Sequence, residues 1–378
     1  MSSEYFASNR GSKGYSDMAL NSSLLKQSKL LEKLSICQRY KIWRIVLKGM
    51  PSRRTSKLTV KDLLFDDVPV RVYWPKTKSD GSRRGLVYFY GGAYMLGSIQ
   101  AYERTCRYLA RESDTVIVCV RYSQAPEHPF PAQYQDCIAA TAHFLKNAKE
   151  YEVDPNRVSV AGDSSGGAIT SAVCQILVTR KDLPRLRSQL LFYPFLQGVD
   201  LCLPSYQQNR SIPVMSKKNA VELGLRYLNE KIKDVSDVMR NAHVPEELRV
   251  RYKKWISAEN IPEEFKVRDY VAVAPAPFSE KLYTMCKLVF DPMISPLLGE
   301  DDVIRQLPEA FIFTCEYDVL RDDGLLYKKR LEDNGVPVTW VHDETGFHGI
   351  LFPIDRYMFE FQKTRSDFQH AIRFLERL

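Results

Sequence analysis

Residues 157–167 read RVSVAGDSSGG, and this stretch decides the fold. The run RVSVA has the length of a buried strand, and a helical pattern begins at Gly167. Between them, Ser164 stands at the centre of a Gly-x-Ser-x-Gly motif. A serine in such a turn projects its hydroxyl clear of the sheet, and the following helix N-terminus favours negative charge there. The motif predicts a nucleophile at Ser164. A plain glycine-rich turn is the alternative, and a phosphate loop fits poorly because no Gly-Lys follows.

Apolar runs of similar length recur on both sides of this motif. They alternate with helical stretches, such as 132–149 and 167–179, which predicts an α/β fold with a mostly parallel central sheet and helices on both faces. Residues 57–65 and 68–74 are typical of an antiparallel pair at a sheet edge. The remaining predicted strands are 85–90, 115–120, 157–161, 189–195, 309–315 and 336–342.

One long insertion interrupts this alternation. Residues 204–290 are polar and helical without strand signals, which predicts a helical cap over the carboxyl ends of the strands. We therefore expect one catalytic domain over residues 57–378, preceded by a Ser- and Gly-rich arm, residues 1–23, that is frayed.

Residues 24–56 form a basic segment with apolar residues at helical spacing. One interpretation is a helix packed on the catalytic domain as part of a lid. The other is an amphipathic stretch, residues 24–50, in peripheral contact with an anionic membrane surface. Both can hold together. The apolar positions are Leu30, Leu31, Leu34 and Cys37.

Composition narrows the class of protein. The chain has 378 residues, 54 Lys+Arg against 46 Asp+Glu, and 44% hydrophobic residues, which excludes disorder. The net charge of +8 is spread out, so we expect no nucleic-acid partner. No apolar run approaches the roughly 20 residues of a membrane span, and no secretory signal is recognisable. The eight cysteines include no Cys-x-x-Cys pair, so we expect no zinc site. Asn209, in Asn-Arg-Ser, is a glycosylation acceptor only if the chain enters the secretory lumen.

A serine nucleophile needs a base, and His348 is the candidate among six histidines. It stands in Gly-Phe-His-Gly, six residues beyond the last predicted strand, where a loop reaches the carboxyl edge of the sheet. His342 shares strand parity with apolar neighbours and is interpreted as a packed side chain. The other histidines fall in helical patterns, in a structural loop or in the cap: His128, His143, His243 and His370.

The acid that orients the base is expected at the end of a strand before the histidine. Asp318 directly follows the strand 309–315 region. Asp322 and Asp323 are interpreted as N-cap and first-turn acids of the next helix. Asp343 and Glu344 are rivals, but they lie too close to His348 in sequence to bridge it easily. The resulting order Ser164, Asp318, His348 is that of the α/β-hydrolases.

Ester or amide hydrolysis also needs donors for an oxyanion. The backbone N–H of Ser165 is one, directly after the nucleophile. The loop after strand 85–90 supplies the others, because glycines let its N–H groups approach a substrate oxygen. We therefore expect Gly91 and Gly92 as donors, with a plain strand-to-helix turn as the alternative.

Together these motifs resemble the hormone-sensitive-lipase (GDXG) group of α/β-hydrolases, and most closely the arylacetamide deacetylase-like proteins, over residues 57–378. The resemblance implies the α/β-hydrolase fold and a serine carboxylesterase or amidase that acts on small, uncharged acyl esters or arylacetamides. It implies no metal and no organic cofactor, and it assigns Ser164 as nucleophile, Asp318 as orienting acid and His348 as base. The matching pieces are YGGAYMLGS at 90–98, YSQAPEHPFPAQYQD at 122–136, DPNRVSVAGDSSGG at 154–167, LPSYQQN at 203–209, LPEAFIFTCEYDVLRDDGLLYKKRLEDNGV at 307–336 and GFHG at 346–349.

Two departures from the family pattern stand out. The His-Gly-Gly-Gly loop reads Tyr90-Gly91-Gly92-Ala93 here, and Ala93 costs on the order of 1–2 kcal/mol if that position needs a positive φ. Relatives of this type usually carry an N-terminal signal-anchor helix, with the catalytic domain in the endoplasmic reticulum lumen, whereas residues 1–50 contain nothing long or apolar enough. The altered loop leaves open a weakly active or inactive hydrolase-like protein that binds a ligand, and the basic arm leaves open a lipase at a membrane surface.

Overall fold

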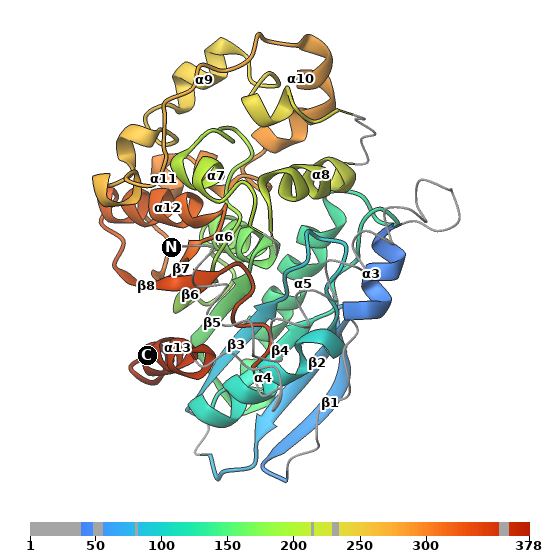
Figure 1. Cartoon of the computed structure of the whole chain (residues 1–378). Coiled ribbons are helices and arrows are strands. Elements are labelled where there is room, and N and C mark those ends of the chain that lie inside the picture. Colours follow the sequence, from blue (N-terminus) through green and yellow to red (C-terminus); the bar gives the residue numbers. More distant parts are fainter. Residues whose placement is uncertain (1–38, 48–55, 80–81, 213–214, 229–233, 355–362) are drawn as a thin grey trace, which may run out of the picture.

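A computed structural model shows one eight-stranded sheet flanked by helices, with a further group of helices above one edge (Figure 1). The structure describes residues 39–47, 56–79, 82–212, 215–228, 234–354 and 363–378.

The strands lie in the order β1-β2-β4-β3-β5-β6-β7-β8, and those from β4 to β8 run parallel. Every residue of β4 and of β6 is buried, as expected for strands covered on both faces. The predicted antiparallel pair forms the edge, where β1 pairs with β2. The predicted α/β class with a mostly parallel sheet is confirmed. The strands are β1 (Leu58–Phe65), β2 (Val68–Pro75), β3 (Arg83–Phe89), β4 (Val116–Val120), β5 (Val153–Asp163), β6 (Ser188–Phe192), β7 (Glu309–Tyr317) and β8 (Val338–Phe347).

Helices cover both faces of this sheet. On one face α5 packs beside α6, and α6 lies on β5 and β6; on the other, α13 packs against α4, which lies on β4 and β2. α12 packs on β7 and β8. These five helices are α4 (Ile99–Ser113), α5 (Ala132–Lys146), α6 (Ser165–Leu177), α12 (Arg321–Asp333) and α13 (Thr364–Glu376).

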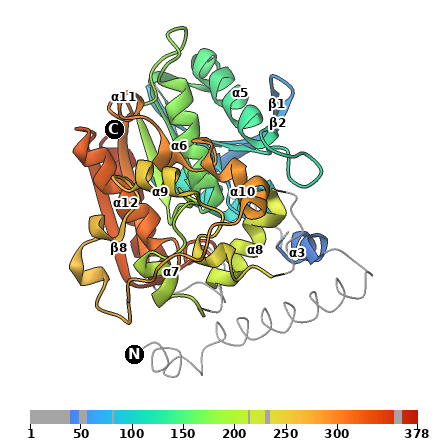
Figure 2. The same cartoon turned by 90° about the horizontal axis from the view of Figure 1, so that it is seen from above.

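Among the described residues, the segment between β6 and β7 contains helices joined by turns and irregular stretches, such as 270–279, and no strand. Its elements gather above the sheet in Figure 1 and lie over α6 and the strand ends when seen from above in Figure 2. They are α7 (Pro204–Gln208), α8 (Lys217–Tyr227), η2 (Val238–Arg240), α9 (Glu246–Tyr252), η3 (Ala258–Asn260), η4 (Glu263–Phe265), α10 (Glu280–Cys286), η5 (Lys287–Phe290), η6 (Pro296–Leu298) and α11 (Asp301–Ile304). A short helix η1 (Ala148–Tyr151) follows α5.

Part of the basic N-terminal segment packs on the domain as α3 (Arg39–Leu47), close to α8 in both views (Figures 1 and 2). Tyr40 is buried, whereas Ile45 is 75% exposed. The predicted arm and the apolar positions of residues 24–38 lie outside the described residues.

Candidate active site

Ser164 lies in the turn between β5 and α6, at the carboxyl edge of the sheet. Its backbone has φ 54° and ψ −122°, a conformation that non-glycine residues rarely adopt. A Cβ on Gly162 would collide with the carbonyl of Gly166, and a Cβ on Gly166 would collide with that of Phe89. The turn therefore needs glycine at both positions, which explains the spacing of the motif.

Ser164, His348 and Asp318 meet although they lie far apart in sequence. The Oγ atom of Ser164 is 2.9 Å from Nε2 of His348. Nδ1 of the same ring is 2.8 Å from Oδ2 of Asp318. The carboxylate can only accept, so Nδ1 donates and Nε2 is left to accept the serine proton.

Each member stands directly after a strand, because the carboxyl ends of parallel strands share one edge. Asp318 follows β7 as predicted. The prediction of a six-residue loop before His348 is wrong: β8 continues to Phe347, with an irregular register against β7 between Cys315 and Tyr317. His348 is therefore held by a strand end and not by a long loop.

The electrostatics of the site favour a protonatable base. Burial alone would lower the pKa of His348, but the facing Asp318 carboxylate and, more weakly, Asp163 favour the charged ring, and the pKa is raised above its ordinary value. The second oxygen of Asp318 accepts the backbone N–H of Leu320 at 2.9 Å, which fixes the carboxylate. The Tyr193 ring meets His348 edge-on, with centroids 5.1 Å apart.

The two acids near Asp318, Asp322 and Asp323, accept hydrogen bonds from the backbone outside the triad. The N-cap of α12 is Leu320, so the predicted N-cap role is wrong and both acids lie inside the first turn. Both are fully buried. Asp322 accepts the backbone N–H of Ser205 at 2.7 Å, and Asp323 accepts that of Leu196 at 2.9 Å. They tie α12 to the chain that leads from β6 into the cap.

Asp343 and His342, which were also considered as acid and base, contact residues outside the triad. Asp343 accepts the N–H and the hydroxyl of Thr345, both at 2.9 Å. His342 is 2.9 Å from the Thr314 hydroxyl and stacks on Trp340, as expected for a packed side chain.

Asn209 was not predicted to contribute to the site. It is fully buried, and its amide donates to the backbone carbonyls of Glu316 at 3.0 Å and of Asp318 at 2.9 Å. It therefore holds the turn that carries the acid, and its burial leaves no room for a glycan in this fold. The motif LPSYQQN contained the signal, but only the fold shows what the asparagine contacts.

The loop after β3 has an unusual backbone. Gly92, Ala93 and Tyr94 have φ values of 113°, 51° and 62°. The carbonyl of Gly92 accepts the N–H groups of Met95 and Leu96 at 3.0 and 2.8 Å, which closes a tight turn. Ala93 therefore occupies the left-handed region, at a cost on the order of 1–2 kcal/mol. Among the described residues, no hydrogen-bond acceptor faces the N–H groups of Gly92 and Ala93.

The geometry argues against the predicted Gly91 donor. Its N–H already donates to the Oδ1 atom of Asp163 at 3.0 Å. Asp163 is buried and also accepts the hydroxyls of Tyr88 at 3.0 Å and Tyr102 at 2.7 Å. Burial raises the pKa of Asp163, and these three donors oppose that shift. Gly91 therefore anchors the loop, and the unpaired amides lie one and two residues further on.

Packing holds Tyr90, which stands where the family resemblance led us to expect a histidine. It is buried between Tyr122 and Tyr102, with ring centroids 4.5 and 5.6 Å away. The Tyr122 hydroxyl donates to the carbonyl of Tyr90 at 2.8 Å. Aromatic stacking and this hydrogen bond thus hold the start of the loop.

A mostly apolar pocket of about 120 Å³ lies beside Ser164 beneath the cap. None of the described residues that line it is Asp, Glu, Lys or Arg. Such a lining favours an uncharged ligand. Its walls include Ala93, Ser165, Phe195, Leu201, Met215, Val221, Leu225, Tyr227, Val238, His243 and Val289.

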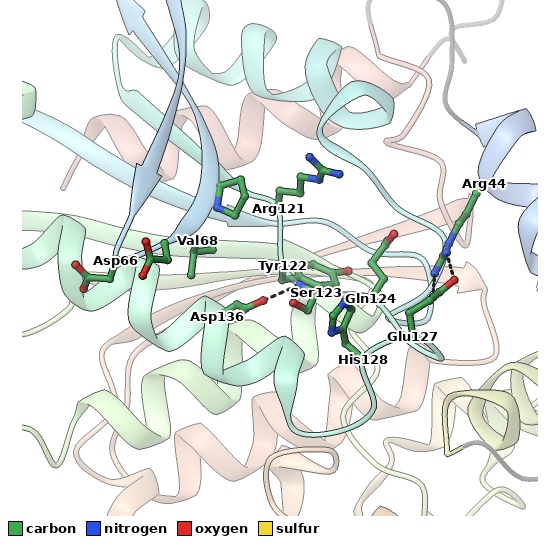
Figure 3. Close-up of a pocket in the computed structure, with 12 residues that line it drawn as sticks. Arg44, Asp66, Val68, Arg121, Tyr122, Ser123, Gln124, Glu127, His128 and Asp136 are labelled. Atoms are coloured by element: carbon green, nitrogen blue, oxygen red, sulfur yellow. Dashed lines mark hydrogen bonds and ion pairs between the residues drawn. The ribbon is translucent and has the colours of Figure 1, made fainter.

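A second cavity, of about 500 Å³, lies away from Ser164 at the antiparallel edge of the sheet (Figure 3). Charges of both signs line it. Arg44 reaches down from α3 to Glu127, and Asp136 accepts the backbone N–H of Ser123 at 2.7 Å (Figure 3). Its mixed charge selects no one class of ligand, and no catalytic group faces it.

Within the described residues, no group of three or more His, Cys, Asp and Glu side chains is arranged to hold a metal ion. Within the same residues, none of the helices combines the length and the apolar character needed to cross a membrane.

Comparison with known proteins gives one consistent answer. Residues 86–250 and 257–352 match a family model described as alpha/beta hydrolase fold. Human arylacetamide deacetylase-like 4 is 44% identical over 89% of this chain and 83% of its own length. Bovine arylacetamide deacetylase is 38% identical over 81% of this chain and 77% of its own. A hyperthermophilic esterase from the archaeon Pyrobaculum calidifontis superposes with a TM-score of 0.65 at 21% identity, over 93% of this chain and 97% of its own, and shows the shared fold.

Proposed function

The chain belongs to the arylacetamide deacetylase-like family of α/β-hydrolases and is a carboxylic ester hydrolase, and from this premise we propose that Ser164, His348 and Asp318 are its catalytic triad. The observation that carries the proposal is the unbroken hydrogen-bond chain from Ser164 Oγ through the imidazole to Asp318, at 2.9 and 2.8 Å. Distances of this kind are what nucleophilic catalysis by serine requires.

In the proposed reaction, Ser164 attacks the acyl carbonyl while His348 takes its proton at Nε2. Asp318 stays ionised and holds the proton of the imidazole on Nδ1. The imidazolium then protonates the leaving alcohol or amine as the tetrahedral intermediate collapses. Water, deprotonated by the same nitrogen, attacks the acyl-enzyme. The imidazolium then returns the proton to Oγ of Ser164 as the acyl bond breaks and the carboxylic acid product leaves.

We assign the oxyanion to the N–H groups of Gly92, Ala93 and Ser165. Ser165 is the first residue of α6, where helix amides have no partner within the helix. Among the described residues, the amides of Gly92 and Ala93, which have positive φ values, make no hydrogen bond. These donors replace the predicted set of Gly91, Gly92 and Ser165.

The substrate class follows from the cavity. Because the described residues that line it include no Asp, Glu, Lys or Arg, we propose small uncharged acyl esters or arylacetamides as substrates. The names of the relatives, which include arylacetamide deacetylase, support an amide as well as an ester. An inactive ligand-binding protein is not favoured, because the three side chains retain the contacts that turnover needs.

Peripheral membrane contact through residues 24–50 is a further part of the proposal. Within the described portion of this segment, Lys41 and Ile45 are exposed on α3. Sedimentation with vesicles that contain anionic lipid tests it: a chain that stays in the supernatant contradicts the proposal.

The test of the triad uses a fluorophosphonate probe together with turnover of p-nitrophenyl acetate and butyrate. We expect the wild-type chain to be labelled and active, and Ser164→Ala to lose both, with kcat down by on the order of 10⁶. The matched control is Ser211→Ala, an exposed serine of the cap segment, which should behave as wild type. Labelling of the wild type without turnover would place the fault in the oxyanion loop. A wild type that is not labelled would contradict the proposed triad.

A further inference from the structure

Helix α8 of the cap carries a glycine, Gly224, that lines the pocket beside Ser164. Glycine in the interior of a helix is destabilising relative to alanine, because it loses more conformational freedom on folding. The backbone at Gly224 is helical and its φ is not positive, so its conformation does not require glycine. The reason for a glycine at this position therefore lies in its surroundings.

Close packing does not supply that reason. Apart from its chain neighbours and the backbone of its own helix, no atom of the described residues lies within 4 Å of a Cβ built on Gly224. By contrast, a Cβ on Gly162 or Gly166, in the turn that carries Ser164, would collide with neighbouring backbone. Gly224 thus faces open space, and no described segment approaches it closely enough to exclude a side chain.

The open space in front of Gly224 belongs to the pocket. At 3.6 residues per turn, Ala220, Gly224 and Leu228 lie one above another on the same side of α8, and all three line the pocket. Leu225 on one flank of this row and Tyr227 on the other also line the pocket and are buried, whereas Gly224 between them is exposed. An exposed residue in the middle of the inward side of a helix indicates an opening, so the pocket reaches solvent at Gly224.

We propose that Gly224 determines which chain lengths the enzyme accepts, because the apolar chain of the substrate leaves the pocket across this glycine. The inference rests on the proposed function, since it assumes that the substrate bound at Ser164 fills the pocket. Leu223 and Leu228, which line the pocket beside Gly224, are half-buried and apolar, and they suit an uncharged chain. The same chemistry describes an acyl chain and an alcohol chain, and the experiment separates the two.

The experiment measures kcat/KM for wild type and variants over two series of esters. The acyl series is p-nitrophenyl acetate, butyrate, hexanoate and octanoate, and the alcohol series is ethyl, butyl, hexyl and octyl acetate. In the series whose chain occupies the pocket, Gly224→Leu should lower kcat/KM for the eight-carbon chain by roughly tenfold to hundredfold, the range for a misfit in an apolar pocket. The two-carbon chain should be cleaved almost as by the wild type. The series that responds identifies the group that crosses Gly224.

The stability of the variants separates this role from a purely structural one. Alanine and leucine both favour a helix more than glycine does, so Gly224→Ala should raise Tm by on the order of 1 °C, with a smaller loss for long chains than Gly224→Leu. A glycine that packing requires would give a lower Tm and an equal loss of turnover at every chain length. That result would overturn the proposal.

The matched control is Lys218→Leu, which adds the same side chain at an exposed position of α8 that does not line the pocket. It should keep the chain-length profile of the wild type. A profile that changes as much in Lys218→Leu as in Gly224→Leu would contradict a steric role of Gly224. Gly224→Ala adds only a methyl group, and it decides the matter if Gly224→Leu does not fold.

Two further results would overturn the proposal. One is an unchanged chain-length profile in both series for folded Gly224→Leu. The other is a wild type that cleaves the two-carbon chains and nothing longer, because no chain would then reach Gly224. Hydrolysis of p-nitrophenyl acetate and labelling by the fluorophosphonate probe report the triad separately. A wild type that shows neither contradicts the proposed function, whereas the two results above contradict the role of Gly224 alone.

Discussion

The loop of residues 90–97 is held on its inner side by a buried carboxylate and on its outer side by a half-exposed arginine. On the inside, Asp163 accepts Gly91 N–H and the hydroxyls of Tyr88 and Tyr102. On the outside, Arg44 of α3 donates through Nε to the carbonyl of Met95 at 2.7 Å. Both regions contact the segment that carries the proposed oxyanion donors, but only the first lies in the sheet core.

The outer region is a small network. The guanidinium of Arg44 also donates to the carbonyl of Ala125 at 2.8 Å and to both oxygens of Glu127 at 2.8 and 2.9 Å, as Figure 3 shows for Glu127. The side chains of Arg44 and Glu127 are 25% and 44% exposed, so water competes for these contacts. From the contrast with Asp163 we expect burial, more than the number of hydrogen bonds, to set how strongly each region fixes the loop.

The largest effect is expected from Asp163→Ala. The variant frees the Gly91 amide and leaves two buried tyrosine hydroxyls without their acceptor. We expect kcat for p-nitrophenyl butyrate to fall by roughly 10²–10³, the range for a lost or displaced oxyanion donor, with a smaller change in KM.

Asp163→Asn is the matched control, because its amide oxygen can still accept from Gly91. It should retain most of the turnover, and thermal unfolding should show that both variants are folded. Wild-type kcat in a folded Asp163→Ala chain would refute the role of the inner region.

The pH dependence separates the two regions further. His348 works as a neutral base, so kcat/KM should fall about tenfold per pH unit below its pKa. That pKa is raised, partly by the charge of Asp163, so the loss of activity begins at a higher pH than an ordinary histidine would give. Removing this charge in Asp163→Asn should move the acid limb to lower pH, whereas Arg44→Ala should leave it in place. The measurement is kcat/KM from pH 5 to 9, and an acid limb that stays fixed in Asp163→Asn would contradict the electrostatic coupling.

The sequence predicted the parts of this site that follow from strand ends. Ser164, Asp318 and His348 were placed because parallel strands bring their carboxyl ends to one edge, and the apolar runs marked those strands. The sequence did not show which backbone N–H groups of the loop after β3 are free to bind an oxyanion. Two adjacent glycines look alike in the sequence. Only the pairing of β3 with β5 shows that the N–H of Gly91, and not that of Gly92, donates to Asp163.

The contacts of Arg44 and Asn209 were equally hard to predict, because single side chains join segments that are more than 50 residues apart. The extent of β8 was missed for a different reason. Its last residues, Asp343–Phe347, are polar or small apart from the final phenylalanine, so the apolar run ends before the strand does.

The smallest effect is expected from Arg44→Ala. Exposed ion pairs are worth roughly 0.2–1 kcal/mol, so kcat should fall by no more than about fivefold and the free energy of unfolding by less than about 1 kcal/mol. Arg44→Lys keeps the positive charge but loses the paired N–H donors of the guanidinium, so its kcat should lie between those of the wild type and Arg44→Ala. The control is Arg251→Ala, which breaks an exposed pair with Glu300 at 2.9 Å in the cap and should change stability by a similar amount without changing kcat. A fall in kcat as large as that of Asp163→Ala would show that the contacts of α3 control the position of the loop. That result would contradict the expectation that the buried contacts matter more than the exposed ones. A kcat unchanged from wild type would show that α3 covers the loop without positioning it.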